Sequence, residues 1–468
     1  MLFRMATVAT LLASLGMVGM AQAGTVKNGT FEATGQGRNG PIDVSVTFKS
    51  GKIQAVKVLK QSETVGIADT ALKEFPQRLV KGNSTAVDSV AGATLTSNGI
   101  RQGVNETIRK AGGSPIDFAV IPISEFKKGE AHNLSTDILV VGAGGSGLSA
   151  AVRAASQGTK VILIEKMPMI GGVTQLNAGT LIATGSRYQR EVMKETKDSP
   201  ELAAKDIMRI GKDRNDPVLV KTITQRVGGV VDWLIDDLKI PYGPAATQYP
   251  DHSANRQLGV QGRSVNFLKL MNQKFADYGG KLMLSTRADR FITDESGKVI
   301  GVKAFDEHGN SYEIKSKATI LASGGYGAEK HRLPRDMRNY VFYGLDSETG
   351  DGLKMATAIG ADTINLDLVK KYPQGVETTP GHGLAATASS TDTIKKSGAI
   401  YVNQDGKRFV NEREGLGALT DATIAQPNHI AYIVMDDAAW KLYVAKSLED
   451  KLVPNAEALD QWAKISDQ

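Results

Sequence analysis

The segment Thr136–Lys166, "TDILVVGAGGSGLSAAVRAASQGTKVILIEK", predicts the fold of the larger part of this chain. It opens with a continuous apolar run, Ile138–Val141, which indicates a buried strand. An alanine-rich segment that suits a helix then runs to Gly158. Between strand and helix stand three glycines in G-x-G-x-x-G spacing: Gly142, Gly144 and Gly147.

A second apolar strand, Val161–Ile164, follows the helix and ends in Glu165. Each part of this unit has a physical task in holding a dinucleotide. The glycines let the backbone approach a pyrophosphate, the helix N-terminus faces the negative charge, and the carboxylate accepts from a ribose hydroxyl. Because strand, glycines, helix, second strand and acid occur in this order, the sequence predicts an α/β dinucleotide-binding domain from Thr136.

Three further segments indicate which kind of dinucleotide-binding domain this is. They are "GGVTQLNAGT" (Gly171–Thr180), "ATILASGGYG" (Ala318–Gly327), which we expect to be a buried strand after a hairpin, and "TGDGLKMATAIGA" (Thr349–Ala361). Together with the first stretch they resemble the FAD-binding domain of the fumarate reductase and succinate dehydrogenase flavoproteins. The resemblance is to the soluble branch with flavocytochrome c fumarate reductase and urocanate reductase, and it extends from Thr136 to the end of the chain.

The resemblance implies an FAD site, with cofactor-binding residues Gly142, Gly144, Gly147, Glu165, Lys166, Gly172, Thr174, Asn177, Ala178, Gly179, Ala288, Gly324 and Asp351. Respiratory members carry a histidine, linked to FAD, just before the paired glycines of the segment matched by Gly171–Thr180. No histidine occurs there, so the FAD is expected to be non-covalent.

The chain of 468 residues contains no cysteine, so it can form no disulfide, iron–sulfur cluster or C-x-x-C-H haem attachment. Its six histidines show no zinc-binding spacing, and no metal is expected. Redox chemistry must therefore use organic cofactors. The net charge of +6 is spread along the chain, which gives no reason to expect nucleic-acid binding.

The first residues, 1–23, have the pattern of a cleaved signal peptide. Arg4 supplies the positive region, a short apolar run follows, and Ala21-Gln22-Ala23 forms an A-x-A cleavage site. We expect a mature protein that begins at Gly24 and resides in the periplasm.

Residues 24–113 read as a small α+β module. Alternating apolar residues predict one strand face from Ile42, Val44, Val46 and Phe48, and a second strand resumes at Ile53. Two helix-like stretches follow. Residues 114–135, with proline, charge and no sustained period, are expected to be a linker.

Within this module "DSVAGATLTS" (Asp88–Ser97) resembles the acceptor motif of FMN-binding domains of sodium-pumping NADH:quinone reductases. There a threonine hydroxyl is joined to FMN through a phosphoester. The pattern implies covalent FMN at Thr96, with Thr94 as the alternative. Covalent FMN would then relay electrons in place of haem.

The resemblance also implies a substrate clamp over residues 365–468, after an FAD-binding domain at 136–364. Tyr372 stands where the fumarate reductases have histidine, and Thr391 and Asp392 stand where they have Thr-Glu, so all three are expected to bind substrate. The catalytic arginine of the family is matched without gaps by Leu416, so Arg413 is the candidate proton donor. The clamp is expected to be incomplete in this chain.

The expected fold is an α/β Rossmann-like FAD-binding domain with an inserted α+β clamp domain, preceded by an α+β FMN-binding domain. The expected function is periplasmic reduction of an α,β-unsaturated carboxylate such as urocanate or fumarate. A membrane quinol dehydrogenase or multihaem cytochrome would donate the electrons, and a monomer is expected. An electron-transfer flavoprotein without small-molecule turnover, or a related flavin dehydrogenase, is the alternative.

Overall fold

The computed structural model divides the chain into two compact units, Met1–Glu125 and Phe126–Gln468. It describes residues 26–63, 68–87, 89–90, 93–119, 129–177, 179–243, 248, 251–338, 340–342, 344–372, 375–379, 382–384, 397–449, 456 and 459. The first unit holds the predicted flavin-acceptor segment, and the second holds the predicted dinucleotide fold.

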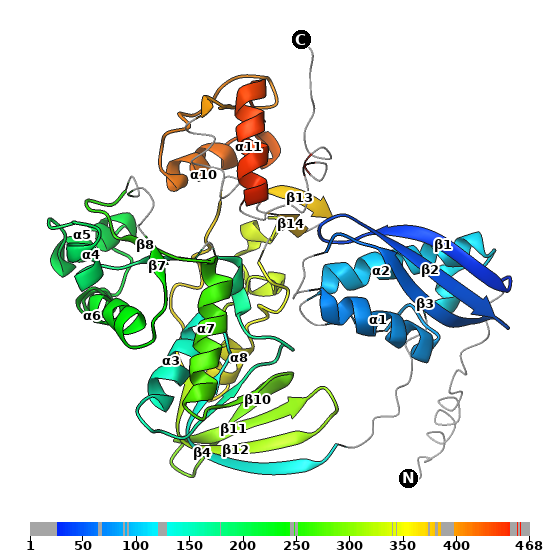
Figure 1. The fold of residues 1–468 in the computed structure, drawn as a ribbon, viewed down its shortest axis with the longest axis horizontal. Helices are drawn as coiled ribbons and strands as arrows, with labels where there is room; N and C mark the ends of the chain where they lie inside the picture. Colours follow the sequence, from blue (N-terminus) through cyan, green and yellow to red (C-terminus); the bar gives the residue numbers. More distant parts are fainter. Residues whose placement is uncertain are drawn as a thin grey trace, which may run out of the picture. The chain divides into compact units, whose positions relative to one another are not determined.

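The first unit is a three-stranded antiparallel sheet, in the order β1-β2-β3, with helices packed against it (Figure 1). Its elements are β1 (Gly29–Gln36), β2 (Pro41–Lys49), β3 (Lys52–Lys60), α1 (Asp69–Gly82), α2 (Thr94–Lys110) and the 3-10 helix η1 (Pro115–Phe118). The alternation predicted for β2 is confirmed, because all four apolar residues lie in the core with the helices: Ile42, Val44, Val46 and Phe48.

Two features of this unit differ from the sequence prediction. Strand β1 was not predicted, because its polar residues and glycines hide the alternation. It touches α2 so closely that a Cβ on Gly35 would lie 2.0 Å from the backbone oxygen of Gly99. The start of the predicted linker also belongs to the core, since Phe118 is buried and its ring centroid lies 6.1 Å from that of Phe48.

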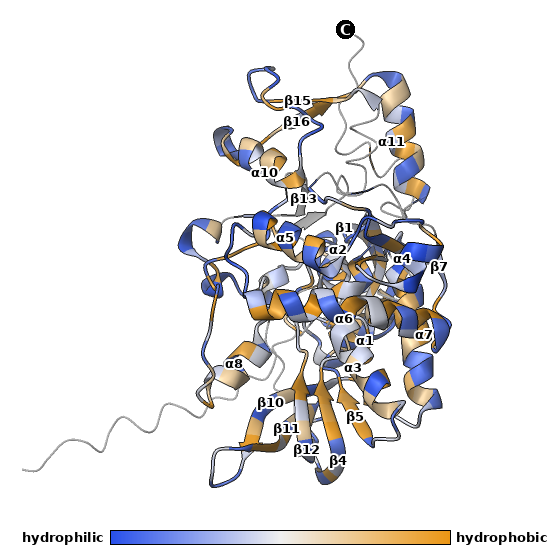
Figure 2. Cartoon of the chain, turned by 90° about the vertical axis from the view of Figure 1, so that its left-hand side faces the viewer, coloured by the Kyte–Doolittle hydropathy of each residue, from blue (hydrophilic) through white to orange (hydrophobic). Residues whose placement is uncertain are grey.

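The second unit is built around a six-stranded mixed sheet in the order β10-β11-β12-β4-β5-β9. The strands are β4 (Ala131–Val141), β5 (Val161–Ile164), β9 (Lys281–Met283), β10 (Thr286–Thr293), β11 (Val299–Asp306) and β12 (Ser311–Leu321). Strands β12, β4, β5 and β9 run parallel, and β10 to β12 form an antiparallel meander. The second half of β4, Ile138–Val141, and the whole of β5 are apolar (Figure 2). The predicted dinucleotide fold is therefore confirmed.

Helices cover this sheet. Helices α3 (Gly145–Ala155) and α7 (Arg263–Asp277) share a core with β4 and β5, while α8 (Asp351–Thr357) packs mainly against β10. The described residues of the unit also form the 3-10 helices η2 (Gly172–Leu176), η3 (Lys330–Arg332), η4 (Arg335–Met337) and η5 (Pro427–His429).

Two strand predictions in this unit need correction. Strand β4 begins inside the predicted linker, because Ala131 pairs with Ser311 at the start of β12. The end of β12 is less buried than expected, and Leu321 is 38% exposed.

A helical group and a small sheet stand beside the main sheet (Figure 1). They are α4 (Arg187–Glu191), α5 (Pro200–Ile210), α6 (Pro217–Asp236), β6 (Thr180–Ile182), β7 (Tyr242–Gly243) and β8 (Gln257–Val260). The later part of the chain adds β13 (Val376–Thr379), β14 (His382–Leu384), β15 (Ile400–Val402), α10 (Leu416–Ile424), β16 (Tyr432–Val434) and α11 (Asp437–Glu449).

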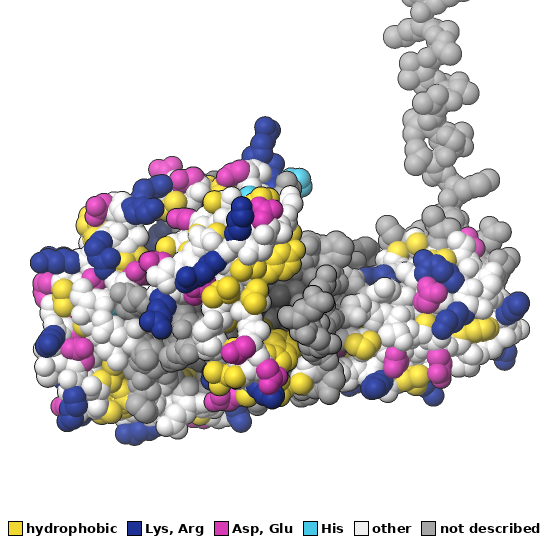
Figure 3. Space-filling model, turned by 90° about the horizontal axis from the view of Figure 1, so that it is seen from above, with side chains coloured by type: hydrophobic (Ala, Val, Ile, Leu, Met, Phe, Trp, Pro, Cys, Tyr) yellow, Lys and Arg dark blue, Asp and Glu magenta, His cyan; other side chains and the backbone are white. Residues whose placement is uncertain are grey.

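Basic and acidic side chains are interspersed on the visible face of each unit (Figure 3). Among the residues that the structure describes, none of the helices is long and apolar enough to cross a membrane.

Candidate functional site

The three glycines after β4 have distinct surroundings. A Cβ on Gly147 would lie 1.8 Å from the carbonyl oxygen of Gly142, and one on Gly142, at φ +103°, would lie 2.4 Å from that of Ala322. These two glycines therefore allow close packing of the backbone. A Cβ on Gly144 would meet its nearest atom, the carbonyl oxygen of Gly171, at 3.7 Å. Gly144 thus leaves open space at the N-terminus of α3, where a pyrophosphate fits.

Glu165, the acid after β5, is buried and turns toward this loop. Its Oε2 accepts from the N–H of Ala143 at 2.8 Å, and its Oε1 accepts from the N–H of Met167 at 2.9 Å. A carboxylate has about four lone-pair sites, so two remain for other donors. Glu165 therefore ties the loop in place and retains the acceptors that ribose hydroxyls require.

The segment 171–180 lies against the same loop. The N–H of Gly171 donates to Ala143, and Thr174 Oγ1 accepts from the N–H of Gly145 at 3.0 Å, the first residue of α3. Gly172 has a φ of +49°, in the left-handed region that favours glycine. A hydroxyl at the start of α3 is well placed to contact an anion there.

The second half of this segment forms a tight turn onto α7. Asn177 Oδ1 accepts from the N–H of Gly179 at 2.7 Å, and Ser264 Oγ donates to the Asn177 carbonyl. A Cβ on Gly179 would lie 2.7 Å from the Cα of Arg263, so only glycine fits. Ala178, also predicted to contact the cofactor, lies outside the described residues.

A charged cluster links the second strand to α8. Lys166 Nζ lies 3.0 Å from both Thr349 Oγ1 and Asp351 Oδ2, and Arg287 reaches Asp351 Oδ1 at 3.0 Å. Burial opposes ionisation of Asp351, but the hydrogen bonds from Lys166 and Arg287 outweigh it and lower its pKa. The structure thus brings together Lys166 and Asp351, which the sequence placed far apart.

The paired glycines after β12 lie beside this cluster. Gly324 has a φ of +79°, and the carbonyl of Gly325 accepts from the N–H of Gly350. Burial raises the pKa of Glu348, while the N–H of Gly325 and the charge of Lys166 act against that rise.

Ala288 has a different setting from the other predicted cofactor residues. It is buried in β10 and packs in the core shared by β4, β5 and α8. In the structure Ala288 therefore packs in the core, and its contact with the cofactor stays a prediction.

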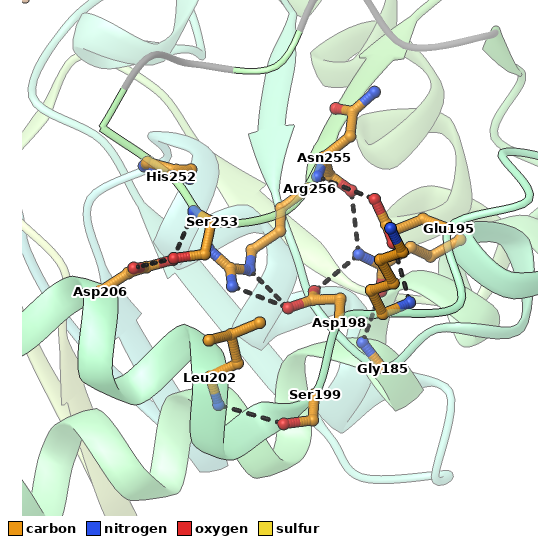
Figure 4. A network of polar contacts seen from close by, with 12 residues as sticks. Gly185, Glu195, Asp198, Ser199, Leu202, Asp206, His252, Ser253, Asn255 and Arg256 are labelled. Atoms are coloured by element: carbon orange, nitrogen blue, oxygen red, sulfur yellow. Dashed lines mark hydrogen bonds and ion pairs between the residues drawn. The ribbon is translucent and has the colours of Figure 1, made fainter.

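A buried ion network supports the small sheet next to the cradle (Figure 4). Arg256 donates to Asp198 Oδ1 at 2.7 and 2.9 Å and to Asp206 Oδ2 at 2.6 Å, and all three side chains are less than 5% exposed. Burial opposes ionisation of Asp206, but donors from Ser253 and Arg256 hold its pKa well below the usual range. Breaking such a pair by removing one partner typically costs about 3–5 kcal/mol.

This network fixes backbone that continues into the cofactor segment. The carbonyl of Arg256 accepts from the N–H of Ala183 at 2.9 Å, next to the pairing of β6 with β8. Val260, at the end of β8, donates to the carbonyl of Gly179 at 2.9 Å. The network therefore anchors the strands that present residues 177–180.

The predicted substrate residues are only partly described. Lys370 Nζ lies 4.9 Å from the ring centroid of Tyr372, which is partly buried. Arg413 is exposed, and its N–H donates to Asn411 Oδ1 at 3.2 Å. Thr391 and Asp392 lie outside the described residues.

The residue before Arg413 is firmly anchored. Glu412 Oε2 accepts from Arg408 at 2.6 Å, and its Oε1 accepts from the N–H of Tyr401 at 2.9 Å. The bond from Arg408 is the main cause that lowers the pKa of Glu412 to about 2. Leu416, which matches the position of the family arginine, is the first residue of α10.

The acceptor segment of the first unit leads into α2. Thr94 is the first residue of the helix and is partly buried, whereas Thr96 is 3% exposed and donates its hydroxyl to Glu63 Oε2. The N-cap residue, Ala93, has no capping side chain, and the first turn contains no acid. The positive end of α2 therefore suits a phosphate group next to Thr94.

The fold and the glycine cradle define a dinucleotide-binding flavoprotein. The family model described as "FAD binding domain" matches residues 137–461, and the one described as "FMN-binding domain" matches residues 37–109. The chain therefore belongs to the FAD-binding domain family, and it carries an FMN-binding domain before the FAD-binding domain.

The relatives are named for reactions on unsaturated carboxylates. A urocanate reductase of Eggerthella lenta is 29% identical over 86% of this chain and 66% of its own length. A fumarate reductase (cytochrome) of Shewanella frigidimarina is 30% identical over 71% of this chain and 57% of its own length. The open conformation of a flavocytochrome c3 fumarate reductase matches with a TM-score of 0.57 and 25% identity, over 70% of this chain and 60% of that one.

The chain spans two thirds or less of the curated relatives described above. Their activities are therefore a guide to a proposal for the whole protein.

Sequence reasoning missed several residues of the site. Thr349 and Gly171 lie in the segments that indicated the FAD site but were not predicted as site residues. Their positions next to predicted cofactor residues were the available signal. Arg287 and the Arg256 network left no local signal, because their partners lie far away in the sequence.

Proposed function

We propose that the protein is a flavin-dependent reductase of an α,β-unsaturated carboxylate. The observation that carries this proposal is the FAD cradle around Gly144, found in a chain whose relatives are named urocanate and fumarate reductases. Bound FAD in its reduced form would supply a hydride to the β-carbon of the substrate.

The chain's own residues would hold the cofactor and handle the substrate. Glu165 would accept from ribose, and Thr174 with the start of α3 would contact the pyrophosphate. Tyr372, Thr391 and Asp392 would contact the substrate. Arg413 would donate the proton to the α-carbon, with its backbone held by the anchored Glu412.

We also propose that FMN is attached covalently and relays electrons to FAD. The sequence motif implied Thr96, with Thr94 as the alternative. We propose Thr94 instead, because Thr96 is buried and its hydroxyl is already bound to Glu63. The Oγ of Thr94 would attack the FMN phosphorus of a flavin dinucleotide. The bond from that phosphorus to AMP breaks, AMP leaves, and the hydroxyl proton is released, with no change in oxidation state.

A second candidate function is electron transfer to a protein partner without turnover of a small molecule. Leu416 favours it, since this apolar residue stands where the family has its proton-donating arginine. A reductase of the proposed kind needs Arg413 or another donor in its place.

We place this activity in the periplasm on the strength of the signal-peptide pattern in residues 1–23, which lie outside the described residues. The electron donor would then be a membrane quinol dehydrogenase or a multihaem cytochrome. We expect the protein to work as a monomer.

The substrate preference provides a test of the proposed reductase. A fumarate carboxylate about 4 Å from an ionised Asp392 would be repelled by about 4 kcal/mol at an effective dielectric constant of about 20. A ring donor, as in urocanate, would instead be attracted. We expect kcat/KM to be higher for urocanate than for fumarate. In Asp392→Asn, the kcat/KM for urocanate divided by that for fumarate should fall by about tenfold or more.

Asp405→Asn is the matched control, because this exposed acid lies in the turn after β15. Its preference for urocanate over fumarate, measured as the ratio of the two kcat/KM values, should equal that of the unmodified protein. Preference for fumarate, or an unchanged ratio in Asp392→Asn, would contradict the assignment of Asp392.

A further inference from the structure

Arg101 of α2 binds the segment that leads to the flavin acceptor. Its Nε donates to the carbonyl of Thr85 at 2.8 Å, and its Nη2 donates to the carbonyl of Val87 at 2.8 Å and to Ser89 Oγ at 3.1 Å. The guanidinium carbon also lies 4.9 Å from the ring centroid of Phe75. One side chain thus holds three positions of this segment against α2.

The first turn of α2 holds the residues on either side of the acceptor. Ser97 Oγ accepts from the N–H of Val90 at 3.1 Å and donates to the carbonyl of Ala93 at 3.0 Å. Thr96, the residue directly before Ser97, donates to Glu63 Oε2, and Glu63 Oε1 accepts from the N–H of Asn39 at 2.9 Å. The described residues before and after Thr94 are therefore tied to the helix and to the sheet side of the unit.

A transferase must bring a phosphorus atom in line with the Thr94 hydroxyl. Misplacing reacting groups by about 1 Å can cost about a hundredfold in rate. We propose that Arg101 is a positioning residue for flavin transfer to Thr94, which it serves by holding Thr85, Val87 and Ser89 against α2. This inference rests on the proposed covalent attachment of FMN.

Lysine can test this role because it keeps the charge but loses the planar fork that reaches several acceptors at once. Arg101→Lys should be compared with Arg109→Lys, a change on the same helix at an exposed residue whose guanidinium contacts Glu106. The flavin-free proteins are incubated with a flavin transferase and FAD, and covalent flavin is measured after acid precipitation. Arg101→Lys should lower kcat by about tenfold or more, with the KM for FAD unchanged, while Arg109→Lys behaves like the unmodified protein.

The comparison is made at a temperature at which circular dichroism shows each variant to be folded. A folded Arg101→Lys that incorporates flavin at the unmodified rate would overturn the proposal. If Arg101→Lys does not fold, Ser89→Ala decides, since it removes one of the three contacts without changing the packing on Phe75. A slower transfer in Ser89→Ala supports the proposal, and an unchanged rate overturns it.

The outcome also separates this inference from the proposed function. Absence of covalent flavin from the unmodified protein would refute covalent attachment itself. Equal flavin incorporation by the unmodified protein and Arg101→Lys would refute only the positioning role.

Discussion

Thr94→Val is expected to abolish covalent FMN, and Thr96→Val is expected to retain it. Valine has nearly the shape of threonine but has no hydroxyl, so each variant removes one possible ester. Thr94 stands at the uncapped start of α2 and is partly buried, while Thr96 is enclosed and donates to Glu63. The measurement is flavin fluorescence of the denatured protein after separation on a gel.

Thr96→Val should fold less stably, since leaving a buried acceptor without its donor costs about 1–3 kcal/mol. Its flavin content should nevertheless remain measurable in the folded fraction. A fluorescent Thr94→Val together with a dark Thr96→Val would assign the ester to Thr96, the residue first indicated by the motif.

Gly144→Val is expected to remove FAD almost completely. The backbone at Gly144 is extended, with φ −72° and ψ −177°, so valine is tolerated there, and its Cβ meets no atom of the chain closer than 3.7 Å. The side chain would instead fill the space at the start of α3 that the pyrophosphate requires. FAD released by acid should fall by about tenfold or more, equivalent to at least about 1.4 kcal/mol of binding free energy.

Gly229→Val is the control, since Gly229 is an exposed residue of α6 where a Cβ meets no atom within 4 Å. It should retain FAD at the unmodified level. The thermal midpoint of flavin-free Gly144→Val should stay close to that of the flavin-free unmodified protein. An unchanged FAD content in Gly144→Val would place the pyrophosphate elsewhere.

The sequence was most informative where the site is contiguous in the chain. Strand β4, the glycine loop, α3 and β5 follow one another directly, so spacing and hydrophobic pattern were enough to predict them. The same holds for β2, whose alternating residues all point into one core.

Contacts between distant residues were beyond prediction from local patterns. Arg256 binds carboxylates that lie 58 and 50 residues earlier, and nothing near Arg256 marks it as buried. Strand β1 was missed because its polar residues and glycines hide the alternation, and its glycines serve a close fit to α2 that no local pattern reveals. The choice between Thr94 and Thr96 depends on side-chain burial, which the motif does not encode.

In the proposed reaction, the flavins of the protein pass their electrons to an unsaturated carboxylate. The most direct test is to reduce the whole flavin-loaded protein anaerobically, mix it rapidly with urocanate, fumarate or buffer, and follow the visible absorbance of the flavins. We expect fast reoxidation by urocanate, slower reoxidation by fumarate and none in buffer, with the saturated acid formed in proportion to the flavin oxidised. Reduced flavin that persists with both acids but is reoxidised by a redox protein would refute the proposed reductase and identify an electron-transfer flavoprotein.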